Sequence, residues 1–305
     1  MSGFSGGRVS PTDGDPGRWW PSVVRGVGKA LFINQMLADT TKIVAFGYDE
    51  NQVGGLYYNS FYTGSSSTLR AGGGVPTATI ENNTYYSFLA ITRSSGMFFL
   101  IKGGLYQNWT LLWIDSARAD TPLYPGIANN NALVSGNYVR LAQLPVPWTD
   151  NYGIATQQLA GARSNGDTFT HEADCLIELT LTTLPSDTTS INFRRQDGSN
   201  YWLLAIPSDG SILLREVISG SATTRGTAAV GSIANGQRIV IIAVGETINV
   251  FANNALKITY TSASNYKTQT SGKIYLGTGG AISDLVTWPR TLPGYLQTML
   301  NRYAK

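Results

Sequence analysis

Short apolar runs bounded by Gly, Asn, Asp or Ser recur along the sequence, and they restrict its possible folds more than any other feature. Residues 174–183 read DCLIELTLTT, in which apolar and polar side chains alternate. A period of two is typical of a strand that buries one face and exposes the other. Asp-Gly pairs at 197–198 and 209–210 and an Asn-Gly pair at 235–236 suit tight hairpin turns. The sequence therefore predicts an all-β protein with antiparallel sheets.

The expected strands fall into two groups, separated by a stretch without regular periodicity. The first group covers residues 29–37, 42–48, 55–62, 85–91, 97–103, 109–115 and 137–144. The second group covers residues 174–183, 189–197, 200–206, 211–217, 237–244, 247–253, 256–262 and 273–279. The segment 29–37 also fits a short helix, because periodicity alone does not decide so short an apolar run.

Composition agrees with sheets and gives no sign of an electrostatic partner. Charged residues make up only 13% of the chain, against roughly a quarter in typical domains. The net charge is +3 and the basic residues form no long run, so nucleic-acid binding is not predicted. The longest apolar stretch, at 239–244, is too short to span a bilayer, and the N-terminus lacks the apolar core of a signal peptide. We expect a soluble product, made in the cytoplasm, with no membrane insertion and no Sec-dependent export.

Reactive side chains are scarce. Cys175 is the single cysteine, so no intrachain disulfide can form, and its place within a strand predicts a small buried side chain. His171 is the single histidine, which excludes a multi-histidine metal site and disfavours a histidine-based triad. We expect both residues to be structural.

The chain divides into four parts. Residues 1–20 are rich in Gly, Ser, Pro and Asp and end in Trp19 and Trp20, which predicts a flexible arm that docks through these aromatics. Residues 21–148 form the first expected β-sandwich, 149–166 a linker, and 167–305 the second sandwich. The last residues carry an apolar stripe at helical spacing, and we expect a short helix, capped by Thr291, on the second domain or on a partner.

One hairpin pattern occurs twice. Residues 85–101 read YYSFLAITRSSGMFFLI and residues 200–214 read NYWLLAIPSDGSILL. Each has a Tyr, a Leu-Ala-Ile run, a short polar turn with Gly and a second apolar run. We interpret the recurrence as an internal duplication, with two tandem copies of one antiparallel β-sandwich.

From residue 167 onward the order of features resembles the concanavalin A-like lectin/glucanase fold, a jelly-roll sandwich, and in particular its laminin-G-like branch. The resemblance is carried by FRRQDGSNYWLLAIPSDGSILLREV, IANGQRIVIIAVGETINVFANN and SGKIYLGTGGAISDLVTWPRTLPGYLQTML. It implies two stacked antiparallel sheets whose concave face binds glycans, binds proteins or hydrolyses glycosides. The residues that fill the family pattern are Arg194, Asp197, Asn200, Tyr201, Asp284, Trp288, Arg290 and Leu292.

Glycoside hydrolysis is disfavoured by an incomplete set of acids. The catalytic branch of this fold places three carboxylates along one strand, and Glu172 with Asp174 is the nearest candidate here. The third acid is expected at position 176 or 177, which Leu176 and Ile177 occupy. We therefore expect no enzymatic activity and no catalytic residue. The Gly-rich segment 70–76 lacks the Lys-Ser/Thr of a phosphate-binding loop and is expected to be a plain loop.

Two kinds of binding site remain open. Glycan binding needs exposed aromatic rings that stack on sugars, and the candidates are Trp109, Trp113, Tyr124 and Trp202, although some of these Trp side chains must lie in the core. The laminin-G-like resemblance also implies a structural Ca²⁺ bound by turn aspartates, for which Asp197 and Asp284 are the candidates. Each aspartate alone is better explained as a turn residue that stabilises its own backbone.

The predicted function is surface display. A docking arm, sparse charge and tandem sandwiches are typical of phage particle proteins, so the leading hypothesis is a non-enzymatic virion subunit of a tail, fibre or capsid decoration. It is expected to be a homo-oligomer or to bind other virion proteins through Trp19 and Trp20, with host-surface glycans as a further ligand. The alternative is a bacterial extracellular carbohydrate-binding or adhesion module, and a glycoside hydrolase is a distant third.

Overall fold

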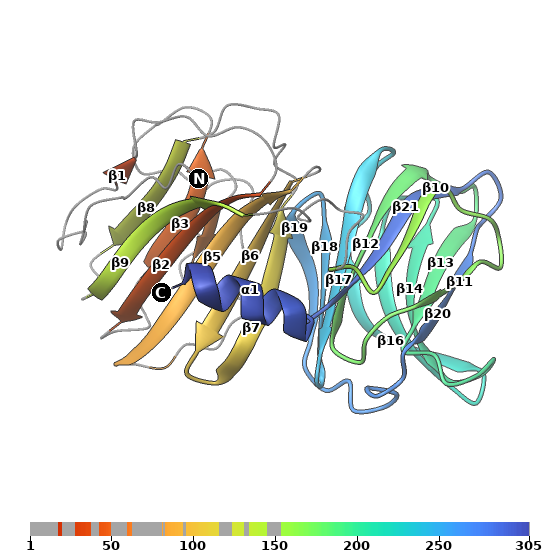
Figure 1. The fold of residues 1–305 in the computed structure, drawn as a ribbon. Helices are drawn as coiled ribbons and strands as arrows, with labels where there is room; N and C mark the ends of the chain where they lie inside the picture. The colour runs from red at the N-terminus through yellow and green to blue at the C-terminus, as the bar shows by residue number, and fades with distance from the viewer. Residues whose placement is uncertain are drawn as a thin grey trace. The chain divides into compact units, whose positions relative to one another are not determined.

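The residues that the structure describes form antiparallel β-sheets and one short helix (Figure 1). Its residues group into two compact units, one formed by Met1–Ile154 with Thr291–Lys305 and the other by Ala155–Arg290. The predicted all-β class with a C-terminal helix is confirmed. The computed structural model describes residues 18–19, 28–37, 43–49, 60–62, 81, 83–93, 96–115, 124–130, 134–144 and 154–304.

The first unit contains a five-stranded and a four-stranded sheet. The segment 29–37 is a strand, β2, because it hydrogen-bonds to β5 on one side and to β9 on the other. The five-stranded sheet has the order β7-β6-β5-β2-β9, with bounds Tyr106–Asp115, Gly96–Gly103, Thr84–Arg93, Lys29–Leu37 and Val134–Gln143. The four-stranded sheet has the order β1-β8-β3-β4, with bounds Arg18–Trp19, Tyr124–Asn130, Ile43–Asp49 and Ser60–Tyr62.

Helix α1 (Gly294–Tyr303) lies across one face of the five-stranded sheet (Figure 1). Its apolar stripe is buried, with Leu296 and Leu300 fully covered. The Gln297 amide fixes the helix to β7, because its Oε1 accepts from the Trp109 backbone N–H at 2.6 Å and its Nε2 donates to the Trp109 carbonyl at 2.8 Å. The structure thus places this helix in the first unit, whereas the sequence analysis assigned it to the second domain.

The start of the helix also differs from the expectation. Pro293 precedes the first turn and no side chain caps it. Thr291 instead forms an isolated antiparallel bridge with Thr110, and the Leu292 N–H donates to the Trp109 carbonyl at 3.1 Å. Pairing with β7 therefore orients the chain as it enters the helix. Among the described residues, no helix has both the length and the apolar character needed to cross a membrane.

The second unit is a pair of six-stranded antiparallel sheets. We call them the β12 sheet and the β14 sheet. The β12 sheet has the order β10-β21-β12-β17-β18-β19, with bounds Gln157–Ala162, Ala281–Pro289, Cys175–Thr183, Gln237–Val244, Thr247–Ala252 and Ala255–Tyr260. The β14 sheet has the order β11-β20-β13-β14-β15-β16, with bounds Thr168–Thr170, Ser271–Tyr275, Thr188–Phe193, Tyr201–Pro207, Ile212–Ile218 and Ser221–Ala228.

Strand β10 lies inside the segment 149–166 that was expected to be a linker. It hydrogen-bonds along β21, with Gln158 opposite Val286. The second unit consequently begins at Ala155, earlier than the predicted boundary. The segment lacks a clear period because β10 is an edge strand with half-buried and exposed side chains.

The core of the second unit lies between its sheets, where alternate side chains of both sheets meet. The predicted alternation in β12 is confirmed, since Ile177 and Leu179 point into this core. The opposite face of β12 is less exposed to solvent than expected, because Glu178 is only 7% exposed. Its carboxylate forms an ion pair with Arg238, whose Nε lies 3.0 Å from Oε1, and accepts a hydrogen bond from the indole N–H of Trp288 at 3.2 Å. Partners of this kind are what a buried carboxylate requires.

Both hairpins of the repeated pattern are present, as β5–β6 and β14–β15. Leu89 pairs with Leu100 in the first hairpin, and Leu204 pairs with Leu214 in the second. Their surroundings differ, because β5 is bordered by β2 whereas β14 is bordered by β13. The second half of β5 is buried on both faces, whereas β14 alternates between half-buried and buried positions only from Tyr201 to Leu204. The two hairpins have the same antiparallel strand pairing, but the strands that border them differ. The internal duplication therefore stays a prediction.

Candidate functional site

Strand β13 delivers two polar side chains into different surroundings. Asn192 lies on the outward face of the β14 sheet, because its neighbours Ile191 and Phe193 both point into the core. Arg194 follows the end of the strand in a left-handed conformation, with φ of 46°. Its side chain reaches the turn between β17 and β18. We call the second region the Arg194 cluster (His171, Ala173, Asp174, Arg194 and Gly245).

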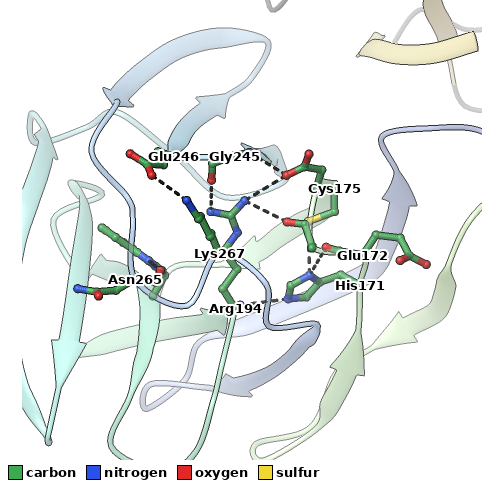
Figure 2. Close-up of polar contacts among 11 residues, drawn as sticks. His171, Glu172, Cys175, Arg194, Gly245, Glu246, Asn265 and Lys267 are labelled. Atoms are coloured by element: carbon green, nitrogen blue, oxygen red, sulfur yellow. Dashed lines mark hydrogen bonds and ion pairs between the residues drawn. The ribbon is translucent and has the colours of Figure 1, made fainter. Parts of the chain in front are cut away.

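The Arg194 cluster ties three chain segments together (Figure 2). Arg194 is 0% exposed; its Nη1 donates to the Gly245 carbonyl at 2.8 Å and its Nη2 to the Ala173 carbonyl at 3.0 Å. Asp174 Oδ1 lies 3.7 Å from Nη2 and accepts from the Gly245 N–H at 2.7 Å. Burial lowers the pKa of Arg194, and the nearby Asp174 opposes that shift. The arrangement is a structural joint that holds the left-handed Arg194 in place.

His171 belongs to the same cluster, and its surroundings favour the neutral imidazole. Its Nδ1 is 2.7 Å from the Glu172 carbonyl oxygen and its Nε2 is 3.3 Å from the Ser271 carbonyl oxygen, and the shorter contact with an acceptor favours the proton on Nδ1. Its Nε2 accepts from the Arg194 backbone N–H at 3.1 Å. Burial lowers the pKa of His171, and the charge of Arg194 adds to that shift. The neutral tautomer therefore satisfies both ring nitrogens.

Cys175 touches the same imidazole without forming a reactive pair. Its Sγ is 3.5 Å from His171 Nδ1 (Figure 2). That nitrogen already carries a proton, so it cannot take one from the thiol. Burial raises the pKa of Cys175 to about 12. An activated nucleophile needs the opposite shift together with a free base, so this contact fits the structural role expected of both residues.

The outward face of the β14 sheet carries a row of side chains from four neighbouring strands. Asn192 on β13 pairs with Lys273 on β20 and with Leu203 on β14, and Leu203 pairs in turn with Arg215 on β15. Paired positions in a sheet point to the same side. We call Lys273, Asn192, Leu203 and Arg215 the outward row.

Two polar atoms of the outward row are buried without a partner. Asn192 is 2% exposed, and its Oδ1 has no hydrogen-bond partner among the described residues. Arg215 Nε is likewise buried and unpaired. A buried polar group left unpaired costs about 1–3 kcal/mol, and such exceptions in a folded protein point to strain or function. The outward row is therefore the candidate binding site.

Aromatic and apolar side chains flank the row on the same face. Tyr275 is 39% exposed, and the ammonium of Lys273 lies 5.0 Å from the centre of its ring. Ser190 pairs with Tyr275 on one side and with Ala205 on the other. Leu213, opposite Ala205, is half-buried. The face thus combines an amide, two cations and a hydroxyl with an exposed ring.

The predicted aromatic platform is not at this face. Trp109, Trp113 and Trp202 are each 0% exposed, so they cannot stack on a ligand at the surface. Trp202 belongs to the core of the second unit and donates its indole N–H to the Asn265 carbonyl at 2.9 Å. These rings are buried because large apolar area contributes most when it is removed from water. The side chain of Tyr124 lies outside the described residues.

The two calcium candidates lie in separate places, Asp197 in a turn and Asp284 within strand β21. Asp197 Oδ1 accepts from the Ser199 N–H at 2.7 Å, and this bond with others to Asn200 lowers the pKa of Asp197. Asp284 has a φ of 53°, and its Oδ1 accepts from the Gly161 N–H at 2.8 Å. Across the described part of the chain, no group of three or more His, Cys, Asp or Glu side chains could hold a metal. Asp197 stabilises a turn, and Asp284 stabilises the backbone of the neighbouring strand β10 where its register shifts.

The remaining predicted positions are placed as follows. Of the docking arm, the structure describes only the backbone of Arg18–Trp19, which pairs with β8, and Trp20 lies outside the described residues. Asp174 belongs to the Arg194 cluster rather than to a pair of acids, and Leu176, where a third acid was sought, is fully buried.

The outward row was missed in the sequence, although one signal pointed to it. Asn is depleted in strands, yet Asn192 stands within TSINF, where the alternation places it opposite Ile191 and Phe193. The sequence prediction of a binding site relied on Trp and Tyr, and an amide in the middle of a strand was not among its candidates. Arg215 and Lys273 become its neighbours only through pairing across the sheet.

Comparison with known proteins gives structural likenesses alone. No protein-family model and no curated protein matches the sequence. A galectin from Caenorhabditis elegans is similar at 12% identity over 43% of this chain and 94% of that one, with a TM-score of 0.36. A carbohydrate-binding module from Bacillus subtilis is similar at 14% identity over 42% and 81%, with a TM-score of 0.29. A sialidase module from Ruminococcus gnavus, bound to α2,3-sialyllactose, is similar at 12% identity over 48% and 98%, with a TM-score of 0.34.

Proposed function

We propose that the protein binds carbohydrate, without catalysis, through the outward face of the β14 sheet. The observation that carries the proposal is Asn192, a 2% exposed amide whose Oδ1 lacks a hydrogen-bond partner among the described residues. An amide in that position can accept from a ligand hydroxyl and recover the hydrogen bond it lost on burial. The alternative drawn from the sequence, a carbohydrate-binding or adhesion module, is thereby preferred over the leading one.

The chemistry of the face suits a sugar ring. Sugars present hydroxyl groups around their edge and C–H groups on their faces, so a complementary surface mixes polar donors and acceptors with apolar area. Here Asn192, Arg215 and Ser190 offer hydrogen bonds, while Tyr275 and the half-buried Leu203 offer apolar surface. A ligand lying across β20, β13 and β14 touches both kinds of group.

The virion setting is a separate proposal. It is supported by the composition of residues 1–20 and by Trp19 and Trp20, which we propose as an anchor to other copies or to other particle proteins. Truncation of these residues should abolish assembly and leave glycan binding intact. The two proposals therefore stand or fall independently.

The glycan proposal is tested on an array of neutral and charged oligosaccharides with the full-length chain. We expect wild-type binding to at least one glycan class, and a loss of at least tenfold in affinity, about 1.4 kcal/mol, for Asn192→Ala. Asn249→Ala is the matched control, because this strand Asn lies on the β12 sheet and its Oδ1 already accepts from Thr259 at 2.9 Å. Absence of any glycan binding, or equal losses in both variants, contradicts the proposal.

A further inference from the structure

The charges on the outward face of the β14 sheet are one-sided. Its outward positions include the cations Lys273 and Arg215, and no carboxylate is found among the described outward residues of its strands. The one acidic residue in these six strands, Glu216, points the other way, since it pairs with the core residue Trp202. Glu216 is also neutralised, because Arg225 donates to its Oε2 at 2.7 Å.

The two cations stand at opposite ends of the outward row. Asn192 and Leu203 lie between Lys273 and Arg215, so the cations are three strands apart. With a strand spacing of about 4.8 Å, their Cα atoms are roughly 14 Å apart. Both side chains are long enough to reach over the row from either end. The span matches one or two sugar rings with a cation at each end.

The two cations also differ in how they are held. Arg215 Nε is buried without a partner among the described residues, while the residue as a whole is half-buried, so a ligand would meet the outer part of its guanidinium. Lys273 lies over the Tyr275 ring at 5.0 Å, a contact that restrains the ammonium through cation–π attraction. A guanidinium recognises planar or tetrahedral oxyanions through paired hydrogen bonds, whereas an ammonium acts as a point charge.

We propose that the ligand of this face is an anionic glycan, with a carboxylate or sulfate oxygen at Arg215, a hydroxyl at Asn192 and a further oxygen at Lys273. This inference rests on the proposed glycan-binding function and names the substrate class. A neutral sugar would offer the half-buried Arg215 guanidinium a weaker acceptor, whereas an anion there forms the stronger, charge-assisted bond. A nucleic acid is a poor fit, because a long phosphate backbone calls for more cations than this row supplies.

The test compares an acidic oligosaccharide with its own neutral derivatives. Binding to the full-length protein is measured for a uronate- or sialate-bearing glycan and its carboxyl-reduced form, and for a sulfated glycan and its desulfated form. Wild type is expected to prefer at least one acidic form by tenfold or more. Loss of affinity on carboxyl reduction identifies a carboxylate, and loss on desulfation identifies a sulfate.

Charge-neutral variants locate the preference. Arg215→Gln and Lys273→Gln should each reduce the preference for the acidic form severalfold, with Arg215→Gln having the larger effect. The control is Lys267→Gln, because Lys267 is not in a strand of the β14 sheet and is engaged with Glu246 at 2.8 Å (Figure 2). If Arg215→Gln perturbs folding, the buried Cys175 will be labelled faster. In that case the Lys273→Gln variant, at a half-buried position, provides the test.

The outcomes separate the two proposals. Equal binding of acidic and neutral forms by wild type overturns the anionic inference and leaves glycan binding intact. Binding of no glycan at all overturns both. If the preference for acidic forms survives in both Arg215→Gln and Lys273→Gln, the anion is recognised outside the outward row and the inference is wrong. Tight binding to single-stranded DNA in place of glycans also contradicts the inference.

Discussion

Asn192 and Arg194, two residues apart at the end of one strand, show how differently this domain uses buried polar groups. In the Arg194 cluster, both Nη atoms of Arg194 and both ring nitrogens of His171 have hydrogen-bond partners, and only Arg194 Nε lacks one among the described residues. In the outward row, Asn192 Oδ1 and Arg215 Nε have none. The first region joins segments of the fold, and the second carries groups whose partner would come from a ligand. Buried polar groups of the two kinds should respond to mutation with opposite signs.

Cys175 provides a direct probe of this contrast. It is the single cysteine, it is fully buried in the core of the second unit, and burial raises the pKa of its thiol to about 12. Thiol reagents should therefore react only when the second unit opens, and labelling rates in the full-length chain report the free energy of that opening. The probe avoids a global unfolding curve, which two units need not share.

Arg194→Leu should have the largest effect. The substitution leaves the Gly245 and Ala173 carbonyls without the donors of Arg194 and removes the cation beside Asp174, and we expect the opening free energy of the second unit to fall by about 3 kcal/mol. Cys175 labelling in wild type and variant measures the difference. A fall below about 1 kcal/mol would show that the cluster is not the joint described here.

Acid should destabilise the second unit through His171. The pKa of His171 is lowered in the folded state by burial, so the unfolded chain binds the proton more readily. Stability is therefore fully present above the unfolded pKa of about 6.5 and is lost as pH falls from there toward the folded pKa, by at most about 1.4 kcal/mol per pH unit. Hydrogen exchange in β12 and β17 between pH 7.5 and 5.5 measures this loss. A His171→Gln variant should lack the slope in this window, and a slope that persists there assigns the effect to other groups.

Lys267→Ala should have the smallest effect, even though Figure 2 places it beside the Arg194 cluster. Lys267 and Glu246 are 2.8 Å apart, but their side chains are 43% and 49% exposed. An exposed ion pair contributes about 0.5 kcal/mol, so Cys175 labelling should barely change. A loss comparable to that of Arg194→Leu would mean that the exposed pair is part of the joint.

How far the sequence predicts each feature depends on whether the signal is local. The alternation in DCLIELTLTT and the apolar run IVIIAV are properties of single strands, so β12 and β17 follow from the sequence. The place of α1 does not follow, because an amphipathic stripe does not say which surface covers it. Its anchor joins Gln297 to Trp109 across 188 residues. The docking arm and the duplication stay predictions.

The candidate site shows the same limit. Alternation alone places Asn192 on the outward face, but whether its amide is paired depends on side chains from three other strands. The Trp residues were proposed as ligand platforms because aromatic rings suit sugars, and the same rings are those that a core buries most favourably. Residue type therefore did not distinguish Trp202 in the core from Tyr275 at the surface.

The most direct test of the account is the stability of Asn192→Val, measured by Cys175 labelling alongside glycan binding. If the unpaired amide is retained for a ligand, removing it should raise the opening free energy of the second unit by about 1 kcal/mol while binding is lost. Asn249→Val, which removes a satisfied amide from the other sheet, should not be stabilising and should leave binding intact. A destabilised Asn192→Val that still binds glycan would contradict the account.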